Sequence, residues 1–133
     1  MILVTHAVVA AGLTAGLTNA LYAFFVGLSS HYLLDMVPHW HYHLPKLRRH
    51  IKALESDERL RLTRSLVPEF AVISLDGLLG ILCSLFFFGS VADPVVIFAA
   101  AFAGILPDML IGFSKFFPTS RILKEHALFH DWI

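Results

Sequence analysis

Positive charge is absent from the first 45 residues, because the first Lys or Arg of the chain is Lys46. A signal peptide normally begins with a basic segment, so we expect the N-terminal segment to be retained, although residues 19–23 loosely resemble a cleavage site. The chain also has a single cysteine, Cys83. One cysteine excludes an internal disulfide and a cysteine-rich metal cluster, and we expect it to pack within an apolar helix.

Charge of either sign is scarce throughout the 133 residues. Only 15% are charged and 57% are hydrophobic, and the mean hydropathy is +0.73. Ordinary soluble domains contain about 25% charged and about 45–50% apolar residues. These values indicate a membrane protein, and the zero net charge gives no reason to expect nucleic acid as a partner.

The apolar residues fall into two long stretches separated by a polar one. We expect each stretch to form a helical hairpin, because each is too long for one membrane span of about 20 residues. Turn residues place the expected helices at about 3–18, 21–37, 67–90 and 94–113, with Pro94 opening the last. Gly12 and Gly16 form a pair of small residues expected to let helices approach closely.

The predicted fold is therefore all-α: an integral membrane bundle of four short apolar helices with additional interfacial or C-terminal helices. We expect a single membrane-embedded domain with a metal site. Its parts are a first hairpin, a basic connector, a second hairpin and a C-terminal helix, at residues 1–37, 38–66, 67–113 and 114–133.

Basic residues predict the orientation of the hairpins. The connector at 38–66 holds seven of the ten Lys and Arg residues, and the C-terminal segment holds the other three. By the positive-inside rule, the connector and both termini face the cytoplasm at the inner cell membrane, and the hairpins point away from it. Membrane lipid is then the expected partner, and a homo-oligomer is compatible with the small surface that four short helices bury.

Polar residues gather at the end of the first apolar stretch. His31 and Asp35 are four residues apart and share one face of the expected helix. Pro38 should end that helix, and His39 and His41 follow it. Imidazoles and a carboxylate in this arrangement are typical ligands of a divalent metal.

Other polar residues are expected at the same depth. His6 and Asp35 lie about equally far from the first turn, as do Asp76 and Asp108 from the second, and His31 lies one turn deeper. The expected C-terminal helix, with histidines four residues apart, begins on this side too. Charged groups in a membrane normally face the bundle interior and one another. The predicted metal ligands are His6, His31, Asp35, His39, His41, Asp76, Asp108, His126 and His130.

Each of these residues also has a purely structural interpretation. A lone His6 near the N-terminus is more often a surface or core histidine than a ligand. Asp35 is also compatible with an ion pair to His31, and Asp108 with a helix cap after Pro107. Their convergence favours a metal site over these alternatives, because unpaired buried charge is costly. Nitrogen and oxygen ligands suit one to three divalent ions, with zinc first and manganese or iron as alternatives.

The segment His31-Tyr32-Leu33-Leu34-Asp35, followed by His41, resembles a signature of the zinc-dependent phospholipase C and single-strand nuclease superfamily. The likeness implies that His31, Asp35 and His41 bind metal. Over more of its length the chain is similar to a family of small membrane-bound metal-dependent hydrolases. The similar elements are Thr5-His6, Ser30-His31 with Asp35 and Pro38, Leu106-Pro107-Asp108, and His126 with His130. This resemblance implies hydrolase chemistry without naming a substrate.

The expected function is therefore metal-dependent hydrolysis of a phosphoester or phospholipid at the cytoplasmic membrane surface. Metal ions activate water and neutralise the phosphate, and Asp76 and Asp108 are the expected catalytic carboxylates, since either can take a proton from water. Two alternatives remain open at this point. One is a metal carrier or sensor without hydrolysis, and the other is a non-catalytic membrane protein whose polar residues join its helices.

Overall fold

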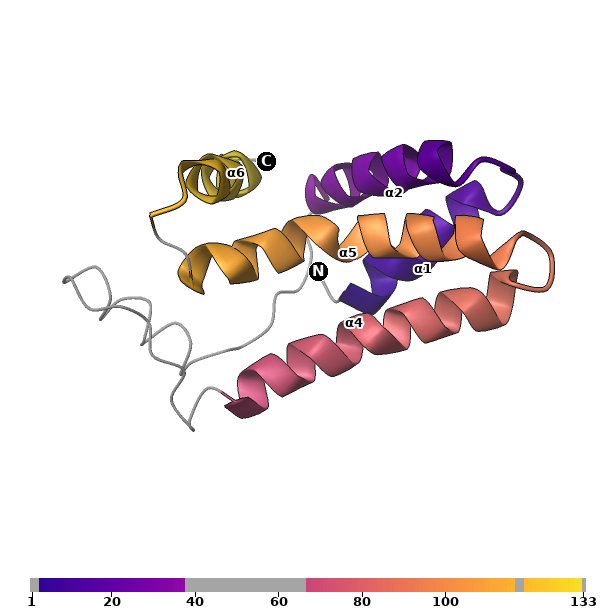
Figure 1. The fold of residues 1–133 in the computed structure, drawn as a ribbon, viewed down its shortest axis with the longest axis horizontal. Helices are drawn as coiled ribbons and strands as arrows, with labels where there is room; N and C mark the ends of the chain where they lie inside the picture. The colour runs from indigo at the N-terminus through magenta and orange to yellow at the C-terminus, as the bar shows by residue number, and fades with distance from the viewer. Residues whose placement is uncertain (1–2, 38–66, 117–118, 133) are drawn as a thin grey trace.

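The computed structural model describes residues 3–37, 67–116 and 119–132. These residues form helices and no strand, as Figure 1 shows. The helices are α1 (Leu3–Thr14), α2 (Ala20–Asp35), α4 (Val67–Phe88), α5 (Pro94–Phe116) and α6 (Arg121–Trp132). The all-α prediction is confirmed, whereas the expected connector at 38–66, with His39 and His41, lies outside the described residues.

Local capping explains where α2 and α5 begin. The side chain of Asn19 accepts a hydrogen bond from the backbone N–H of Tyr22 at 3.1 Å, which satisfies a donor that the first helical turn leaves open. Asp93 does the same for α5, because its Oδ1 accepts from the N–H of Val95 at 2.8 Å. Both turns therefore lie where their residue types predict.

Two helix ends differ from the prediction. α1 ends at Thr14, four residues earlier than expected, and the hydroxyl of Thr14 donates to the carbonyls of Ala10 and Ala11. α5 ends at Phe116, three residues later than the expected 113, and it continues through Pro107, although a proline inside a helix removes one backbone hydrogen bond and can kink or end the helix. Pro107 is buried in a helix that packs against α1, α2 and α4, and this tertiary packing maintains the helix beyond the proline.

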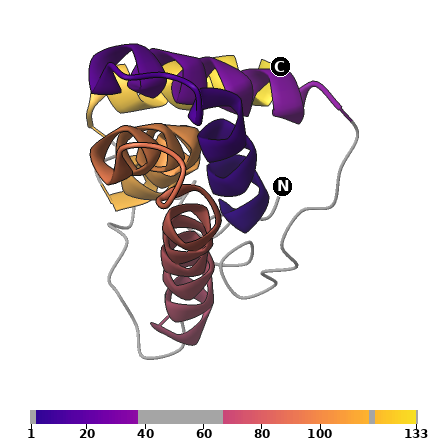
Figure 2. The ribbon, with the colours of Figure 1, turned by 90° about the vertical axis from the view of Figure 1, so that its right-hand side faces the viewer.

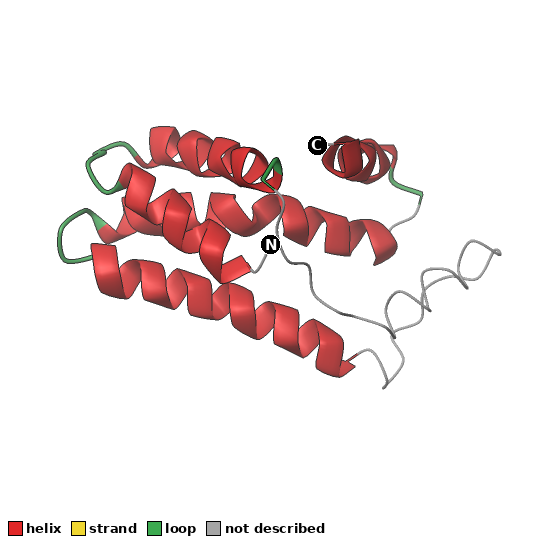
Figure 3. Cartoon of the chain, turned by 180° about the vertical axis from the view of Figure 1, so that it is seen from behind, coloured by secondary structure: helices red, strands yellow, loops and turns green. Residues whose placement is uncertain are grey.

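The helices form two hairpins that point the same way. In Figure 1, α5 runs through the middle, with α2 along one side and α4 along the other. α1 packs against α2, α4 and α5, and the end-on view in Figure 2 shows it beside α5. Both turns lie at one end of the bundle, while α6 crosses the opposite end, as Figure 3 shows from behind.

Small residues allow the central helices to pack closely. The two clusters of buried apolar side chains are rich in alanine, and they consist of Leu3, Ala7, Ala101 and Ile105, and of Ala10, Ala23, Val96 and Ala100. A Cβ added at Gly27 would collide with the backbone of Ala100. One added at Gly104 would lie 2.8 Å from the carbonyl oxygen of His6. The bundle therefore depends on glycine where α5 meets α1 and α2.

The predicted close contact is wrong at Gly16, where an added Cβ would meet nothing within 4 Å. At Gly12 an added Cβ would lie 3.3 Å from the ring of Phe88, the last residue of α4, so a side chain and not a helix backbone lies close to it. Gly16 lies beyond the end of α1, and Gly12 is exposed. Spacing alone identified small residues, but it did not identify the face of the helix that other helices cover.

Two helices are long and apolar enough to cross a membrane, by length and composition. These stretches are Phe70–Phe88 in α4 and Pro94–Ser114 in α5. α1 has 12 residues and α2 has 16, whereas a span needs about 20. The structure thus contains two candidate spans, and four spans remain part of the proposal below.

Candidate metal centre

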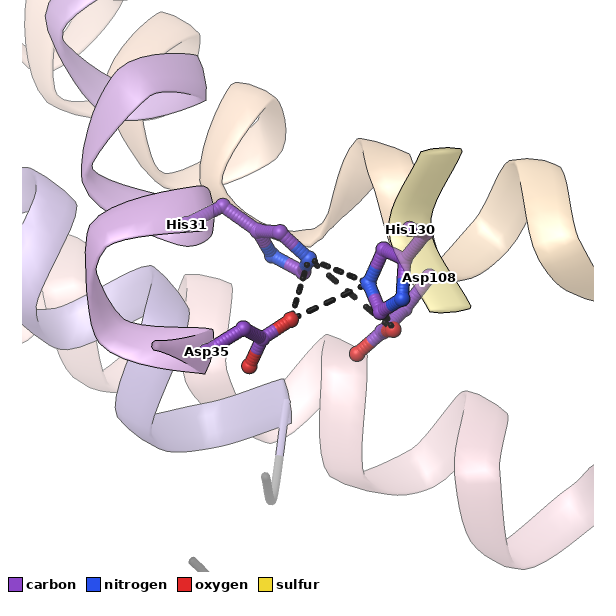
Figure 4. Close-up of side chains that lie close together, drawn as sticks. All are labelled: His31, Asp35, Asp108 and His130. Atoms are coloured by element: carbon purple, nitrogen blue, oxygen red, sulfur yellow. Dashed lines mark hydrogen bonds and ion pairs between the residues drawn. The ribbon is translucent and has the colours of Figure 1, made fainter. Parts of the chain in front are cut away.

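Four side chains from three helices meet at the end of the bundle that α6 crosses. His31 and Asp35 project from successive turns of α2, Asp108 comes from α5, and His130 comes from α6 (Figure 4). One ligand atom from each residue lies within 4.8 Å of the other three. Residues almost a hundred positions apart in the chain therefore form one candidate metal-binding group.

The two imidazoles face the two carboxylates. His31 Nε2 lies 3.1 Å from Asp35 Oδ2 and 3.9 Å from Asp108 Oδ1. His130 Nε2 lies 3.0 Å from the same Asp35 oxygen and 3.4 Å from the same Asp108 oxygen. The two Nε2 atoms are 3.1 Å apart. All four ligand atoms thus point toward one small volume.

These spacings match the ligand shell of a tetrahedral ion. Zinc binds imidazole nitrogen and carboxylate oxygen at about 2.0–2.2 Å, so tetrahedral ligands lie about 3.3 Å from one another. Five of the six separations among the ligand atoms of His31, His130, Asp35 and Asp108 lie between 3.0 and 3.9 Å, and the whole group lies within 4.8 Å. This group could therefore hold a metal ion with little movement of its side chains.

A backbone carbonyl orients the His31 ring. His31 Nδ1 lies 2.7 Å from the carbonyl oxygen of Gly104 on α5. A carbonyl oxygen only accepts, so Nδ1 carries the hydrogen and donates it. The neutral ring then has its lone pair on Nε2, which faces Asp35 and Asp108. Metal-binding histidines almost always donate their other ring N–H in this way, which fixes the tautomer and the orientation of the ring.

His6 lies directly beside this group. Its ring stacks on that of His31, with centroids 4.2 Å apart and an interplanar angle of 28°. Its Nε2 is 3.3 Å from Asp35 Oδ1, whereas His31 and His130 lie 3.1 and 3.0 Å from Asp35 Oδ2. The side chain is fully buried, and neither ring nitrogen has a hydrogen-bond partner of good geometry among the described residues. A buried polar group without a partner is costly, so His6 is a second candidate for metal binding.

Asp76 has a different environment. Its Oδ2 accepts a hydrogen bond from the backbone N–H of Val4 at 3.1 Å. This N–H belongs to the first turn of α1, where helix donors lack partners within the helix and where negative charge is favourable. Asp76 is not among the four residues of the metal-binding group, and its described contact joins α4 to α1.

His126 pairs with a residue that its spacing does not indicate. Its Nε2 lies 3.2 Å from the hydroxyl oxygen of Tyr32 on α2. Burial lowers the pKa of His126 below its ordinary value, and the imidazoles of His130 and His31 lower the pKa further, against the opposing effect of Asp108. The ring is therefore neutral near pH 7, which suits a hydrogen bond to a tyrosine hydroxyl.

The structure places most of the predicted ligands together. His31, Asp35, Asp108 and His130 form the group, His6 touches it, and His126 lies one helical turn away on α6. Asp76 accepts a hydrogen bond from the first turn of α1 and is not in the group, while His39 and His41 lie outside the described residues. The sequence did not indicate Tyr32 or the Gly104 carbonyl, because both act across helices that are distant in the chain.

Comparisons of this chain with protein-family models, curated proteins and solved structures gave no match. Its functional interpretation therefore depends on the geometry and chemistry of the residues above.

Proposed function

We propose that this chain is a membrane-bound metal-dependent hydrolase of phosphoesters. One observation carries the proposal: the Nε2 atoms of His31 and His130 and the carboxylates of Asp35 and Asp108 converge at metal-ligand spacing. The His31–Gly104 hydrogen bond adds support, because it prepares the His31 lone pair for a cation. Zinc is the first choice for this donor set, with manganese or iron as alternatives.

A second ion beside His6 belongs to the same proposal. The two oxygens of Asp35 face different partners, with Oδ1 toward His6 and Oδ2 toward His31 and His130. A carboxylate arranged in this way suits a bridge between two ions. Pairs of divalent ions are common in phosphoester hydrolysis, where they bind the attacking and the leaving oxygen.

Asp108 is the carboxylate best placed to act on a substrate. Its side chain is 26% exposed, against 8% for Asp35, so solvent reaches it more easily. A bound divalent ion would lower the pKa of water and neutralise phosphate charge. Water then adds to phosphorus while its proton passes to the Asp108 carboxylate. As the ester P–O bond breaks, that proton passes to the leaving oxygen and an alcohol is released.

The surface of α4 supports a location in the membrane. Only 17% of its apolar stretch, within Phe70–Phe88, is buried inside the protein. Large side chains such as Leu75, Leu79 and Phe86 are exposed. The core helix of a soluble protein would be covered, whereas an uncovered apolar helix requires an apolar surrounding. We therefore propose that both hairpins insert into the inner membrane, with α1 and α2 crossing incompletely or by local thinning.

The position of the site fits a lipid substrate. Asp108 lies six residues before Ser114, where the α5 span ends, which places it about 9 Å from that end at about 1.5 Å per residue. Arg121 and Lys124 of α6 lie on the same side, and the two turns at the other end contain no basic residue. The positive-inside rule then places the site and α6 at the cytoplasmic surface, beside the phosphates of the lipid headgroups.

A metal carrier or sensor is the second candidate, and one observation favours it. Four protein ligands at tetrahedral spacing close the coordination of a zinc ion, as in structural sites, whereas catalytic sites keep one position for water. In a carrier or sensor, Asp108 would be the fourth ligand of the ion. In the hydrolase, a water molecule would occupy that fourth position.

Elemental analysis and a hydrolysis assay on the same preparation test the proposal. We expect one or two equivalents of zinc, manganese or iron, and cleavage of a chromogenic phosphodiester or of phospholipid in mixed micelles that a chelator abolishes. Metal without cleavage of either substrate would favour the carrier or sensor. Less than a tenth of an equivalent, even after incubation with each metal, would contradict both.

A further inference from the structure

Helix α6 has few apolar attachments to the bundle. None of its described side chains is buried, and neither cluster of buried apolar residues includes one of them. Ile122 and Trp132 are more than 80% exposed. The hydrophobic effect therefore contributes little to its docking, and polar and aromatic contacts must determine where α6 lies.

Tyr32 makes several of these contacts. Its hydroxyl pairs with His126 Nε2 at 3.2 Å, and its ring meets Phe129 edge-on, with centroids 5.4 Å apart. The same ring lies edge-on against His31 at 5.5 Å and against His130 at 6.3 Å. One residue of α2 thus touches both ligand imidazoles and two further side chains of α6.

His126 and His130 are four residues apart on α6, so they share one face of the helix. A contact that fixes His126 therefore also fixes the rotation of α6 at His130. His126 itself is outside the metal-binding group, and its Nε2 faces the tyrosine rather than a carboxylate. The sequence alone treats the two histidines alike. In the structure, His130 belongs to the metal-binding group and His126 pairs with Tyr32.

We propose that Tyr32 and His126 are positioning residues whose contact across α2 and α6 holds His130 Nε2 against His31, Asp35 and Asp108. The inference rests on the proposed metal site, since it assigns how one ligand of that site is held. It predicts that the Tyr32–His126 pair acts on metal affinity through His130 alone. A pair that only stabilised the fold would act on affinity whether or not His130 is present.

A double-mutant cycle on zinc affinity tests this inference with the full chain in detergent. Tyr32→Phe removes the hydroxyl and keeps the ring, so we expect the Kd for zinc to rise about fivefold, the effect of one net hydrogen bond. The number of ions bound should not change. In a His130→Ala background, Tyr32→Phe should have no further effect, because non-additivity reports a shared route of action.

Two replacements of His126 test whether a hydrogen-bonding side chain opposite Tyr32 is enough to keep zinc affinity. His126→Gln retains a side-chain amide for Tyr32 and should keep the wild-type Kd within about twofold, whereas His126→Phe should show the same rise as Tyr32→Phe. Tyr22→Phe is the matched control, because Tyr22 lies on the same helix and is 61% exposed.

The outcomes separate this inference from the function on which it rests. Zinc binding by the wild type with an unchanged Kd in Tyr32→Phe would overturn the positioning role alone. So would additive effects of Tyr32→Phe and His130→Ala. An absence of zinc binding by the wild type would overturn the metal site and the positioning role together.

Discussion

The two hairpins have similar backbones and unequal chemistry. In each, two antiparallel helices meet at a capped turn at the same end of the bundle, and the second helix carries an aspartate near the opposite end. The hairpin of α1 and α2 supplies His6, His31 and Asp35 to the site, while that of α4 and α5 supplies Asp108. Asp76, the remaining acid of the second hairpin within a helical interior, accepts from the N–H of Val4.

This difference separates two uses of a carboxylate in an apolar helix. Asp35 and Asp108 face imidazoles at the contact between α2 and α5, where two hairpins and α6 converge. Asp76 faces the N-terminus of α1, where backbone N–H groups supply the positive end of a dipole. Both environments offset the cost of burying a charge, but among the residues that the structure describes, a metal-ligand set surrounds Asp35 and Asp108 and not Asp76.

The largest effect should come from removing the second hairpin's single ligand. Asp108→Ala leaves three ligands and should weaken zinc binding more than about a hundredfold. Even residues that only hydrogen-bond to metal ligands typically change metal affinity by about 10–100-fold. Elemental analysis after dialysis against a weak chelator measures the loss. Asp93→Asn, at the exposed turn of the same hairpin, is the control, and an unchanged zinc content in Asp108→Ala would restrict the site to α2 and α6.

The contact between the hairpins should be almost as sensitive. In Gly27→Ala, the new Cβ collides with the backbone of Ala100, so α2 and α5 must separate at a cost of about 1–3 kcal/mol. Thermal unfolding in detergent, without metal, measures the change. Gly112→Ala has open space around its Cβ and should be neutral or slightly stabilising. Equal stability of the two variants would contradict the close α2–α5 packing.

Replacing His6 tests whether the first hairpin supplies a ligand for a second metal ion. His6→Gln should remove the second ion proposed beside His6 and leave one equivalent of zinc, because the His6 Nε2 lies beside Asp35 Oδ1, while His31 and His130 lie beside Asp35 Oδ2. The remaining ion should keep its affinity within about tenfold, as expected when a neighbour of the ligands changes. Titration followed by elemental analysis distinguishes the two ions, and loss of all zinc would show that His6 belongs to a single shared centre.

The smallest effect is expected at Asp76. Asp76→Asn keeps an oxygen acceptor for the N–H of Val4 and loses the negative charge, so the free energy of unfolding should fall by about 0.5–1 kcal/mol. Zinc content should be unchanged. Thermal unfolding and elemental analysis on one preparation measure both quantities, and a loss of bound zinc would return Asp76 to the predicted ligand set.

Much of the fold follows from local sequence. Apolar stretches, Asn19 and the Asp93-Pro94 pair predicted the helices and both turns, because capping and burial of apolar residues depend on near neighbours and on composition. The ends of α1 and α5 were less predictable. Whether Pro107 interrupts a helix depends on the helices packed around it, which the local sequence does not specify.

The sequence by itself determined that His6, Asp35, Asp76 and Asp108 lie at about one depth, with His31 one turn deeper and the C-terminal helix starting on the same side, since helix rise and hairpin geometry place equal distances from a turn at equal depth. Only the tertiary structure decided which of them meet. Depth leaves the rotation of each helix open, and that rotation turned Asp76 toward α1 and His126 toward Tyr32. It was set by contacts between distant residues, such as Gly27 against Ala100, which no spacing within one helix encodes.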